Sequence, residues 1–205
     1  TASAGRTLFI PKGKYKVSTT LFITTRSTHL VGDFANRNTE NGTEISYTGT
    51  GPCLQIGTDS GNPWDTNGYN GVQDHKFENL AVIHGVPDTT LVGNGGVGNH
   101  FKAGAYGLWD WRGGGITMRE CWLQGFEANF VGIQSDIDLL DNVVSLLSKY
   151  GIYVGPRSDQ FTLRNLYCHS SDRAVVVDGA THVRIVDAQI VGTGTDTVSA
   201  IEVRS

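Results

Sequence analysis

Short alternations of apolar and polar residues recur along the second half of the chain at nearly constant spacing. Four segments each read apolar, any, apolar, any, then an acid or amide: ITMRECWL, IDLLDNVV, FTLRNLYC and VRIVDAQI, which start at Ile116, Ile137, Phe161 and Val183. Their starts lie 21, 24 and 22 residues apart. HKFENLAV, from His75, fits the same frame before a long insertion. A repeat of this length is typical of a solenoid, in which each repeat forms one coil.

A second set of segments places a further strand in each repeat. GLWDW, GIQS, GIYVG, AVVVDG and AIEVRS begin at Gly107, Gly132, Gly151, Ala174 and Ala200. Each repeat therefore contains three short strands with period-2 alternation, and no helical periodicity separates them. The predicted fold class is all-β, a single-stranded parallel β-helix with three short strands per coil of about 21–26 residues.

Apolar residues at equivalent positions of successive coils form the predicted core. Equivalent strands stack about 4.8 Å apart, so an inward position repeats as a column along the axis. The predicted inward columns are Ile116, Ile137, Phe161 and Val183; Met118, Leu139, Leu163 and Ile185; and Leu108, Ile133, Ile152, Val175 and Ile201. Cys121 and Cys168 also fall on inward positions, which favours buried thiols outside any disulfide. A polar column is predicted at a tight turn, where stacked side chains bond one another: Asn79, Glu120, Asp141, Asn165 and Asp187.

Composition and charge exclude several classes of function. The 205 residues suffice for one domain, and a net charge of −4 with scattered Lys and Arg gives no electrostatic footprint for nucleic acid. No apolar run approaches the roughly 20 residues that span a bilayer, so no membrane insertion is expected. The 3 cysteines and 6 histidines show no metal-ligand spacing, so neither a metal site nor a cofactor is predicted.

The first 50 residues carry a family resemblance. GRTLFIPKGKYKV, LFITTRSTHLVGD and GTEISYTG resemble the N-terminal coil of the pectate-lyase-like superfamily of right-handed parallel β-helices, particularly the branch of bacteriophage tailspikes and polysaccharide depolymerases. The resemblance implies one right-handed helix over 1–205, with this coil at 1–50 and regular coils at 75–205. It also implies that the protein forms a homotrimer and is located in a virion tail or outside the cell. We expect a piece of a longer β-helix or an unusually short member, because an uncovered end exposes strand edges.

The stretch GLWDWRGGG predicts an aromatic platform. Alternation turns Leu108 inward and both Trp109 and Trp111 outward. Such rings suit a carbohydrate, because they cover the apolar faces of sugars while polar neighbours bond the hydroxyl groups. The expected substrate-binding residues are Trp109, Trp111, Tyr153 and Gln134, with Trp122 and Tyr167 on the neighbouring strand. The alternatives are burial under long turns or at a subunit contact.

Asp110 lies between the two tryptophans and is predicted to point inward. A buried carboxyl group must accept hydrogen bonds or stay protonated. The glycines from Gly113 to Gly115 form a sharp turn whose amides reach it, and Arg112 neutralises its charge. The favoured interpretation is structural, and a catalytic Asp110 is the alternative.

Carboxylates in the predicted outward columns are the candidates for catalysis. Asp136 and Asp178 fall in one column with Gly155 between them, about 9.6 Å apart at the backbone. Inverting glycosidases hold two carboxyl groups about 6.5 to 9.5 Å apart, so this pair is the first candidate, and Glu202 in the same groove is the third carboxylate. Glu120 and Asp141, about 4.8 Å apart in the turn column, have the spacing of a retaining pair that shares a proton, but their position in that column favours a structural role.

These features predict a carbohydrate-active protein that binds and depolymerises a bacterial surface polysaccharide. Hydrolysis is favoured over a lyase reaction, for which Tyr153 and several arginines offer basic groups. The acidic and arginine motifs of pectate lyases and the full set of NTD, DD, HG and RIK signatures of polygalacturonases are both missing, which argues against either of these two activities. One alternative is a noncatalytic structural or adhesion β-helix, and another is a secreted pectinase-like enzyme. The segment 57–71 is too long for an ordinary turn and is expected to form a rim, a lid or a weak calcium loop.

Overall fold

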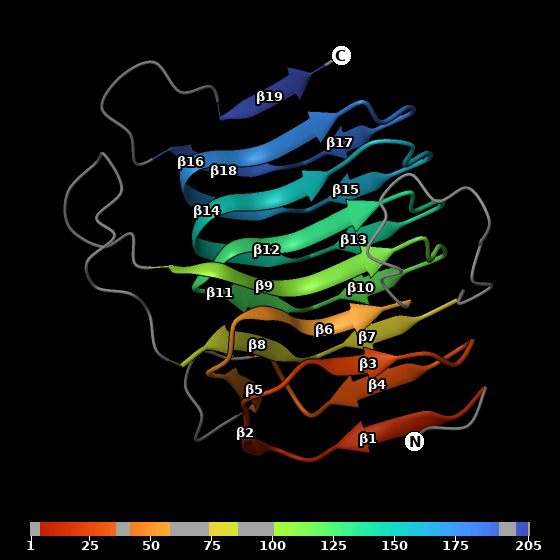
Figure 1. Ribbon diagram of the computed structural model, residues 1–205, viewed down its shortest axis with the longest axis vertical. Helices are drawn as coiled ribbons and strands as arrows, with labels where there is room; N and C mark the ends of the chain where they lie inside the picture. Colours follow the sequence, from red (N-terminus) through yellow and green to blue (C-terminus); the bar gives the residue numbers. More distant parts are fainter. Residues whose placement is uncertain (1–4, 36–41, 58–73, 86–100, 193–199, 205) are drawn as a thin grey trace.

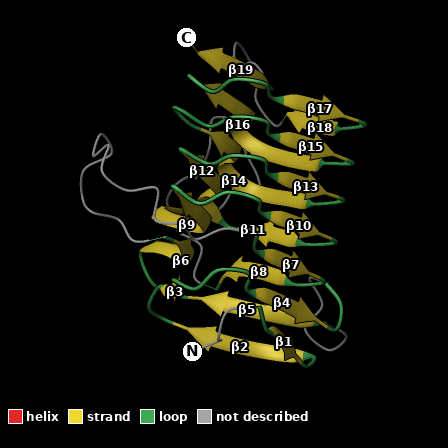
Figure 2. Cartoon of the chain, turned by 90° about the vertical axis from the view of Figure 1, so that its right-hand side faces the viewer, coloured by secondary structure: helices red, strands yellow, loops and turns green. Residues whose placement is uncertain are grey.

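The strands of the protein stack coil upon coil. The computed structural model describes residues 5–35, 42–57, 74–85, 101–192 and 200–204. Within them every element is a β-strand, every strand pairing is parallel, and no helix is long and apolar enough to cross a membrane. Successive coils rise from the N-terminal end to the C-terminal end (Figure 1 and Figure 2). The predicted parallel β-helix is therefore confirmed, although residues 58–71 of the predicted rim, lid or calcium loop lie outside the described residues.

One sheet collects the first strand of every coil. In spatial order it contains β1 (Thr7–Ile10), β4 (His29–Gly32), β7 (Lys76–Glu78), β10 (Thr117–Arg119), β13 (Leu139–Asp141), β15 (Thr162–Arg164) and β17 (Arg184–Val186). We call its outer surface the first-strand face. These strands are short because each coil turns a corner at both of their ends, which leaves room for only one or two inward side chains per strand.

The second sheet contains the remaining strands and wraps around the other two sides of the coil. It contains β2 (Gly13–Val17), β3 (Leu21–Ile23), β5 (Thr43–Tyr47), β6 (Gly51–Ile56), β8 (Ala81–His84), β9 (Lys102–Trp111), β11 (Trp122–Gln124), β12 (Phe126–Ile133), β14 (Val144–Val154), β16 (Tyr167–Asp178), β18 (Gln189–Gly192) and β19 (Ile201–Arg204). In β14 and β16 two sides of the coil join into one bent strand, and register shifts after Leu146 mark the bend.

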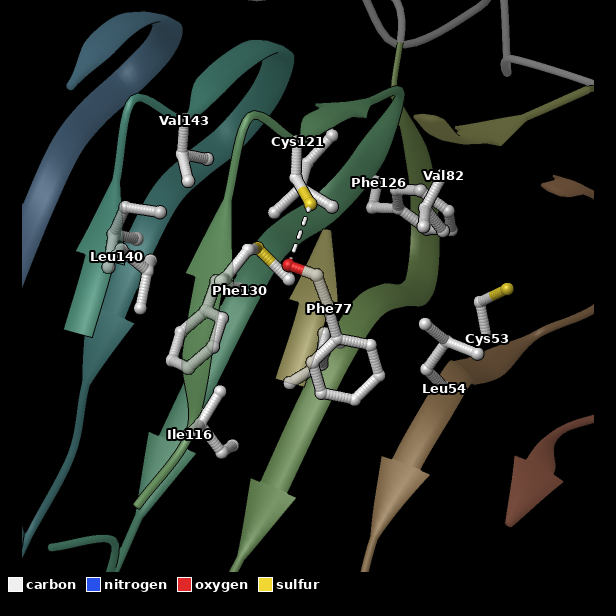
Figure 3. Close-up of a cluster of buried hydrophobic side chains, with 14 of the residues drawn as sticks. Cys53, Leu54, Phe77, Val82, Ile116, Cys121, Phe126, Phe130, Leu140 and Val143 are labelled. Carbon is white, nitrogen blue, oxygen red and sulfur yellow. Dashed lines mark hydrogen bonds between the residues drawn. The ribbon is translucent and has the colours of Figure 1, made fainter. Parts of the chain in front are cut away.

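The interior is a stack of apolar side chains. Leu108, Phe130, Ile152 and Val175 pair in successive coils and are fully buried. Burial of one such side chain contributes about 1.5–3 kcal/mol to stability, so the continuous column holds the coils together. Figure 3 shows Cys121 in a buried cluster that includes Phe77 and Phe130, and its thiol lies 3.4 Å from the carbonyl oxygen of Phe77.

The cysteines behave as core residues. Cys53, Cys121 and Cys168 are all buried and none forms a disulfide, as predicted for Cys121 and Cys168. Burial raises the pKa of the Cys53 and Cys121 thiols to about 12. Both thiols therefore stay protonated at neutral pH, which makes them poor nucleophiles.

Three of the predicted inward positions are wrong, and all three errors are shifts of register. Ile137 is 65% exposed, and the inward position between Ile116 and Phe161 belongs to Asp138, which is 2% exposed. Likewise Leu140, not Leu139, pairs with Met118 and Leu163. The run IDLL carries apolar residues on both alternations, so a period-2 pattern cannot distinguish the two registers. Ile133 does not occupy its predicted inward position next to Leu108, because Phe130 is the residue that pairs with Leu108.

The polar turn column is also shifted by one residue in one coil. Its members share a left-handed backbone with φ between 51 and 57°: Asn79, Glu120, Asn142, Asn165 and Asp187. Asn142, not Asp141, therefore occupies the turn, and its Nδ2 donates to Glu120 Oε2 at 2.6 Å. The predicted hydrogen bonding between stacked polar side chains is therefore confirmed between Glu120 and Asn142.

Asp141 lies on the first-strand face instead of in the turn. It pairs in register with Arg119 and Arg164 and forms a hydrogen-bonded ion pair with Arg164. This contact lowers the pKa of the Asp141 carboxyl group. The predicted proton-sharing pair of Glu120 and Asp141 is therefore wrong, because the nearest charges to Asp141 are positive.

Candidate functional site

The outward columns of the third side of the coil differ from the predicted ones. One column consists of Gln55, Trp109, Val131, Tyr153, Val176 and Glu202. The next pairs Trp111 with Ile133 and Asp178 with Arg204. Gln134 and Asp136 belong to neither column, because β12 ends at Ile133 and both residues lie in the following turn. Asp136 and Asp178 are thus not two steps apart in one column, and that prediction is wrong.

The aromatic platform is smaller than predicted. Trp111 is 4% exposed, because its ring packs 6.4 Å from that of Trp109 and 5.9 Å from the guanidinium group of Arg112. Trp109 is half-buried and stands edge-on against Tyr106 at 4.6 Å. Tyr153, two coils further along, is half-buried as well. Only Trp109 and Tyr153 of the three predicted rings keep an accessible surface on this side.

Three of the predicted residues meet in one charged network. The hydroxyl group of Tyr153 donates to Asp178 Oδ2 at 2.6 Å, and Arg204 lies 3.5 Å from Asp178 and 3.0 Å from Glu202. Arg173 binds Glu202 from the other side at 2.6 Å. We call Tyr153, Arg173, Asp178, Glu202 and Arg204 the arginine-bridged face.

The arginines decide what this face can do. Hydrogen bonds from Arg204 and Arg173 lower the pKa of Glu202, so this carboxylate is a poor proton donor. Burial and the bond to Asp178 raise the pKa of Tyr153, so its hydroxyl group is a poor base. Fixed charges and hydroxyl groups of this kind suit the binding of sugar hydroxyls better than proton transfer.

The remaining predicted binding residues lie elsewhere. Trp122 and Tyr167 occupy one column of the second side of the coil, two steps apart with Val144 between them. Trp122 Nε1 donates to Gln124 Oε1 at 3.1 Å, and both rings are half-buried. Gln134 accepts a 2.7 Å hydrogen bond from Arg112 Nε at the corner. The structure therefore does not bring these three side chains to the arginine-bridged face.

A second polar cluster occupies the corner that leads into the first-strand face. Asp136 pairs with Gly114 on one side and with Asp159 on the other, so the two acids lie in successive coils. Asp159 Oδ1 accepts hydrogen bonds from Thr181 Oγ1 at 2.8 Å and lies 2.6 Å from His182 Nδ1. We call Asp136, Asp159 and His182 the acidic corner.

The two acids of this corner have opposite pKa shifts. Partial burial, together with the charge of Asp159, raises the pKa of Asp136. Hydrogen bonds from His182 and Thr181 lower the pKa of Asp159. Environments that move the pKa values of two neighbouring carboxyl groups apart define one as a proton donor and the other as a base or nucleophile.

A groove lies beside the acidic corner on the first-strand face. Its volume is about 650 Å³, and its main lining residues are Ile137, Leu139, Gln160, Thr162, His182 and Arg184. They form two rows of three, because Ile137, Gln160 and His182 each precede a first strand by two residues, while Leu139, Thr162 and Arg184 begin those strands. Ile137, Gln160 and His182 all have positive φ, from 52 to 62°. This backbone turns their side chains away from the core.

Two further acids lie inside the coil directly behind this corner. Asp110 is fully buried and Asp138 is 2% exposed, and the hydroxyl group of Ser135 bridges them. The amide of Ile116 donates to Asp138 at 2.9 Å. Burial raises the pKa of both acids, to about 7 for Asp138. A carboxyl group in this environment is protonated at mildly acidic pH and stabilises the structure in that form.

The sequence prediction missed Asp138 and Asp159. Asp138 was missed because the apolar pattern of IDLL fits two registers. A coil length of 22 residues, counted from Ile116, would have assigned Asp138 to the inward position. Asp159 lies in a turn with no periodic pattern, so only the corner geometry identifies it. Of the described residues, no group of three or more His, Cys, Asp or Glu side chains is placed to hold a metal ion.

The three glycines after Arg112 have a structural role, as predicted. A Cβ atom on Gly113 would lie 2.1 Å from Asp110 Oδ1. We expect Gly113→Ala to lower the free energy of unfolding by about 1–3 kcal/mol, because the methyl group displaces the buried acid. Urea denaturation measures the change. In an Asp110→Ala background the cost is expected to shrink, and an equal cost in both backgrounds would show that the clash is not the cause.

Comparison with known proteins identifies the fold. No family model and no curated protein sequence matches this chain. DFA-IIIase from Arthrobacter chlorophenolicus A6, without its lid, superposes with a TM-score of 0.71 at 10% identity, over 95% of this chain and 52% of that chain. ORF18 of Geobacillus virus E2 gives a TM-score of 0.53 at 11% identity, over 93% and 34%. The A-module of a mannuronan C-5 epimerase from Azotobacter vinelandii gives 0.50 at 12% identity, over 97% and 71%.

At these identities the similarity shows the fold alone. The chain is a right-handed parallel β-helix of the kind that the sequence predicts. It spans about half the length of the DFA-IIIase chain that it matches.

Proposed function

We propose that this β-helix binds a polysaccharide along its outer surface and hydrolyses it at the acidic corner. The observation that carries the proposal is the pair Asp136 and Asp159, which lie in successive coils beside an open groove and have opposite pKa shifts. The solved structures of similar fold include DFA-IIIase in complex with GF2 and a mannuronan C-5 epimerase. This similarity supports a carbohydrate ligand without specifying the reaction.

The roles of the two acids follow from their environments. Asp136, with the raised pKa, donates a proton to the glycosidic oxygen as the bond to the leaving sugar breaks. Asp159, ionised and hydrogen-bonded to His182, attacks the anomeric carbon from the opposite side. Water then cleaves the glycosyl ester, and Asp136 removes its proton. A single coil step of about 4.8 Å at the backbone matches the carboxyl spacing of retaining rather than inverting enzymes.

The residues of the arginine-bridged face serve as binding groups in this proposal. Trp109 and Tyr153 offer aromatic surface, while Asp178 and Glu202 accept hydrogen bonds from sugar hydroxyls. A catalytic role for Asp178 or Glu202 is the weaker hypothesis, because Arg204 lies against both carboxyl groups and, with Arg173, lowers the pKa of Glu202. A lyase reaction with Tyr153 as the base is also disfavoured, since the raised pKa of Tyr153 keeps its hydroxyl group protonated.

The experiment that tests the proposal measures polymer length. The purified chain is incubated with a panel of bacterial surface polysaccharides, and light scattering follows their mass. Shortening with retention of the anomeric configuration by NMR is the expected result. Binding without shortening would favour the second candidate, a noncatalytic adhesion β-helix, for which the ion-paired arginine-bridged face is the specific observation.

The assembly of the protein is a separate part of the proposal. A tailspike-like homotrimer in a virion tail or an extracellular setting is implied by the family resemblance of the first coil. A light-scattering mass of three chains for the protein itself would support this assembly. A mass of one chain would favour the secreted, pectinase-like enzyme.

A further inference from the structure

The groove beside the acidic corner changes in character from coil to coil. Its outward side chains are Ile137 and Leu139 in the first coil, Gln160 and Thr162 in the second, and His182 and Arg184 in the third. Asp138, which is 2% exposed, and Val183 also line it. The row Leu139, Thr162, Arg184 is set by direct strand pairing. Since each coil adds about 4.8 Å, the groove passes from apolar to neutral polar to basic within about 10 Å.

Arg184 differs from four other arginines of the outer surface, each of which has a carboxylate partner. Arg119 and Arg164 pair with Asp141, and Arg173 and Arg204 pair with Glu202. Within the described part of the chain, Arg184 has no carboxylate partner. A guanidinium group in a groove, with no carboxylate partner among the described residues, is suited to a carboxylate or phosphate of a ligand.

The apolar end of the groove has its own unusual feature. Ile137 is 65% exposed and has φ of 62°, a backbone region that β-branched residues rarely adopt. Glycine occupies the equivalent position in the preceding coil, where Gly115 has φ of 67°. An exposed aliphatic side chain held in this conformation offers apolar contact to the C–H face or a methyl group of a sugar.

We infer that this groove binds an anionic sugar of the polysaccharide, with its carboxylate or phosphate group on Arg184 and its apolar face on Ile137 and Leu139. Gln160 and Thr162 supply hydrogen bonds to hydroxyl groups between the two ends. His182 uses Nδ1 for Asp159, so its Nε2 is available to the same ligand. The inference rests on the proposed function, since it takes the groove to be the substrate site, and it adds the charge class of the substrate.

The test is a binding measurement that requires no turnover. NMR titrations of the Asp136→Asn variant use methyl β-glucuronide, glucose 6-phosphate and the neutral methyl β-glucoside. We expect the two anionic sugars to shift the Arg184 side-chain and Ile137 methyl signals and the neutral sugar to bind more weakly. Arg184→Gln should weaken anionic binding about threefold to fivefold, and about 0.5 M salt should weaken it in the parent variant.

The matched control is Arg164→Gln, which removes an arginine of the same face that is paired with Asp141 and lies outside the groove lining. Equal effects of the two substitutions, equal binding of charged and neutral sugars, or an absence of shifts at the groove would overturn the inference. A preference between glucuronide and phosphate identifies the anion. Polymer shortening without groove binding would leave the proposed hydrolysis standing, whereas groove binding without shortening would remove only the catalytic role.

Discussion

Asp136→Asn is expected to lower kcat for polymer cleavage by a factor of about 10² to 10⁴, the usual contribution of a positioned general acid. The amide keeps the size of the side chain but cannot give a proton to the leaving oxygen. Binding should change little, because the amide still accepts and donates hydrogen bonds. Reducing-end assays at saturating polymer measure kcat, and NMR titration measures binding separately.

Asp159→Asn should cause a loss of similar size for a different reason, since it removes the nucleophile. The pH profile of kcat/KM separates the two roles, because activity requires Asp159 ionised and Asp136 protonated. The lowered pKa of Asp159 sets the acid limb, and the raised pKa of Asp136 sets the alkaline limb. Asp141→Asn is the matched control, since this acid is bound by Arg164 outside the corner. Full activity of the Asp136→Asn variant would rule out the assignment.

The protein is also expected to lose stability as the pH rises from about 4 to about 7. The pKa of Asp138 is raised from an ordinary 3.8 to about 7 by burial, with the charge of Asp136 adding to it. Between these two pKa values the folded state holds a proton that the unfolded chain has released. The stabilisation is therefore complete below the ordinary pKa of 3.8 and is lost as the pH rises through the pKa of the folded state. Over about three pH units the loss amounts to about 4 kcal/mol.

Asp138→Asn should remove the part of this dependence that Asp138 causes and make the protein more stable than the parent at pH 8. The amide oxygen still accepts from the amide of Ile116, and no charge forms behind Ser135. Asp110 keeps its own raised pKa, so a comparable slope should remain. Urea midpoints at pH 4.5 and pH 8 measure the effect, with Asp178→Asn as the surface control. A parent protein equally stable at both pH values would contradict the protonated pair.

The architecture follows from local patterns in the sequence. Apolar residues at every second position, repeated at each coil length, specify strands that bury one side, and stacking is the arrangement that covers every strand at once. For the same reason the inward positions of Leu108, Ile152 and Val175 and the buried state of Cys121 were predictable. The role of the glycine turn beside Asp110 was predictable as well, because a buried acid needs close backbone neighbours.

The neighbours of each functional group depended on the tertiary structure. Which carboxylates meet is set by the number of residues in each corner, and corners have no periodic pattern to count. Because the stacking register is shifted by one residue at Ile137, Asp138 lies in the core. Asp136 lies in the turn after Ile133, next to Asp159 and away from Asp178. The burial of Trp111 was decided by the rings and the guanidinium group packed around it. The apolar pattern of the sequence is enough to predict that the chain coils and which columns are apolar. The stacking register depends on the whole coil, and it decides which polar groups share a site.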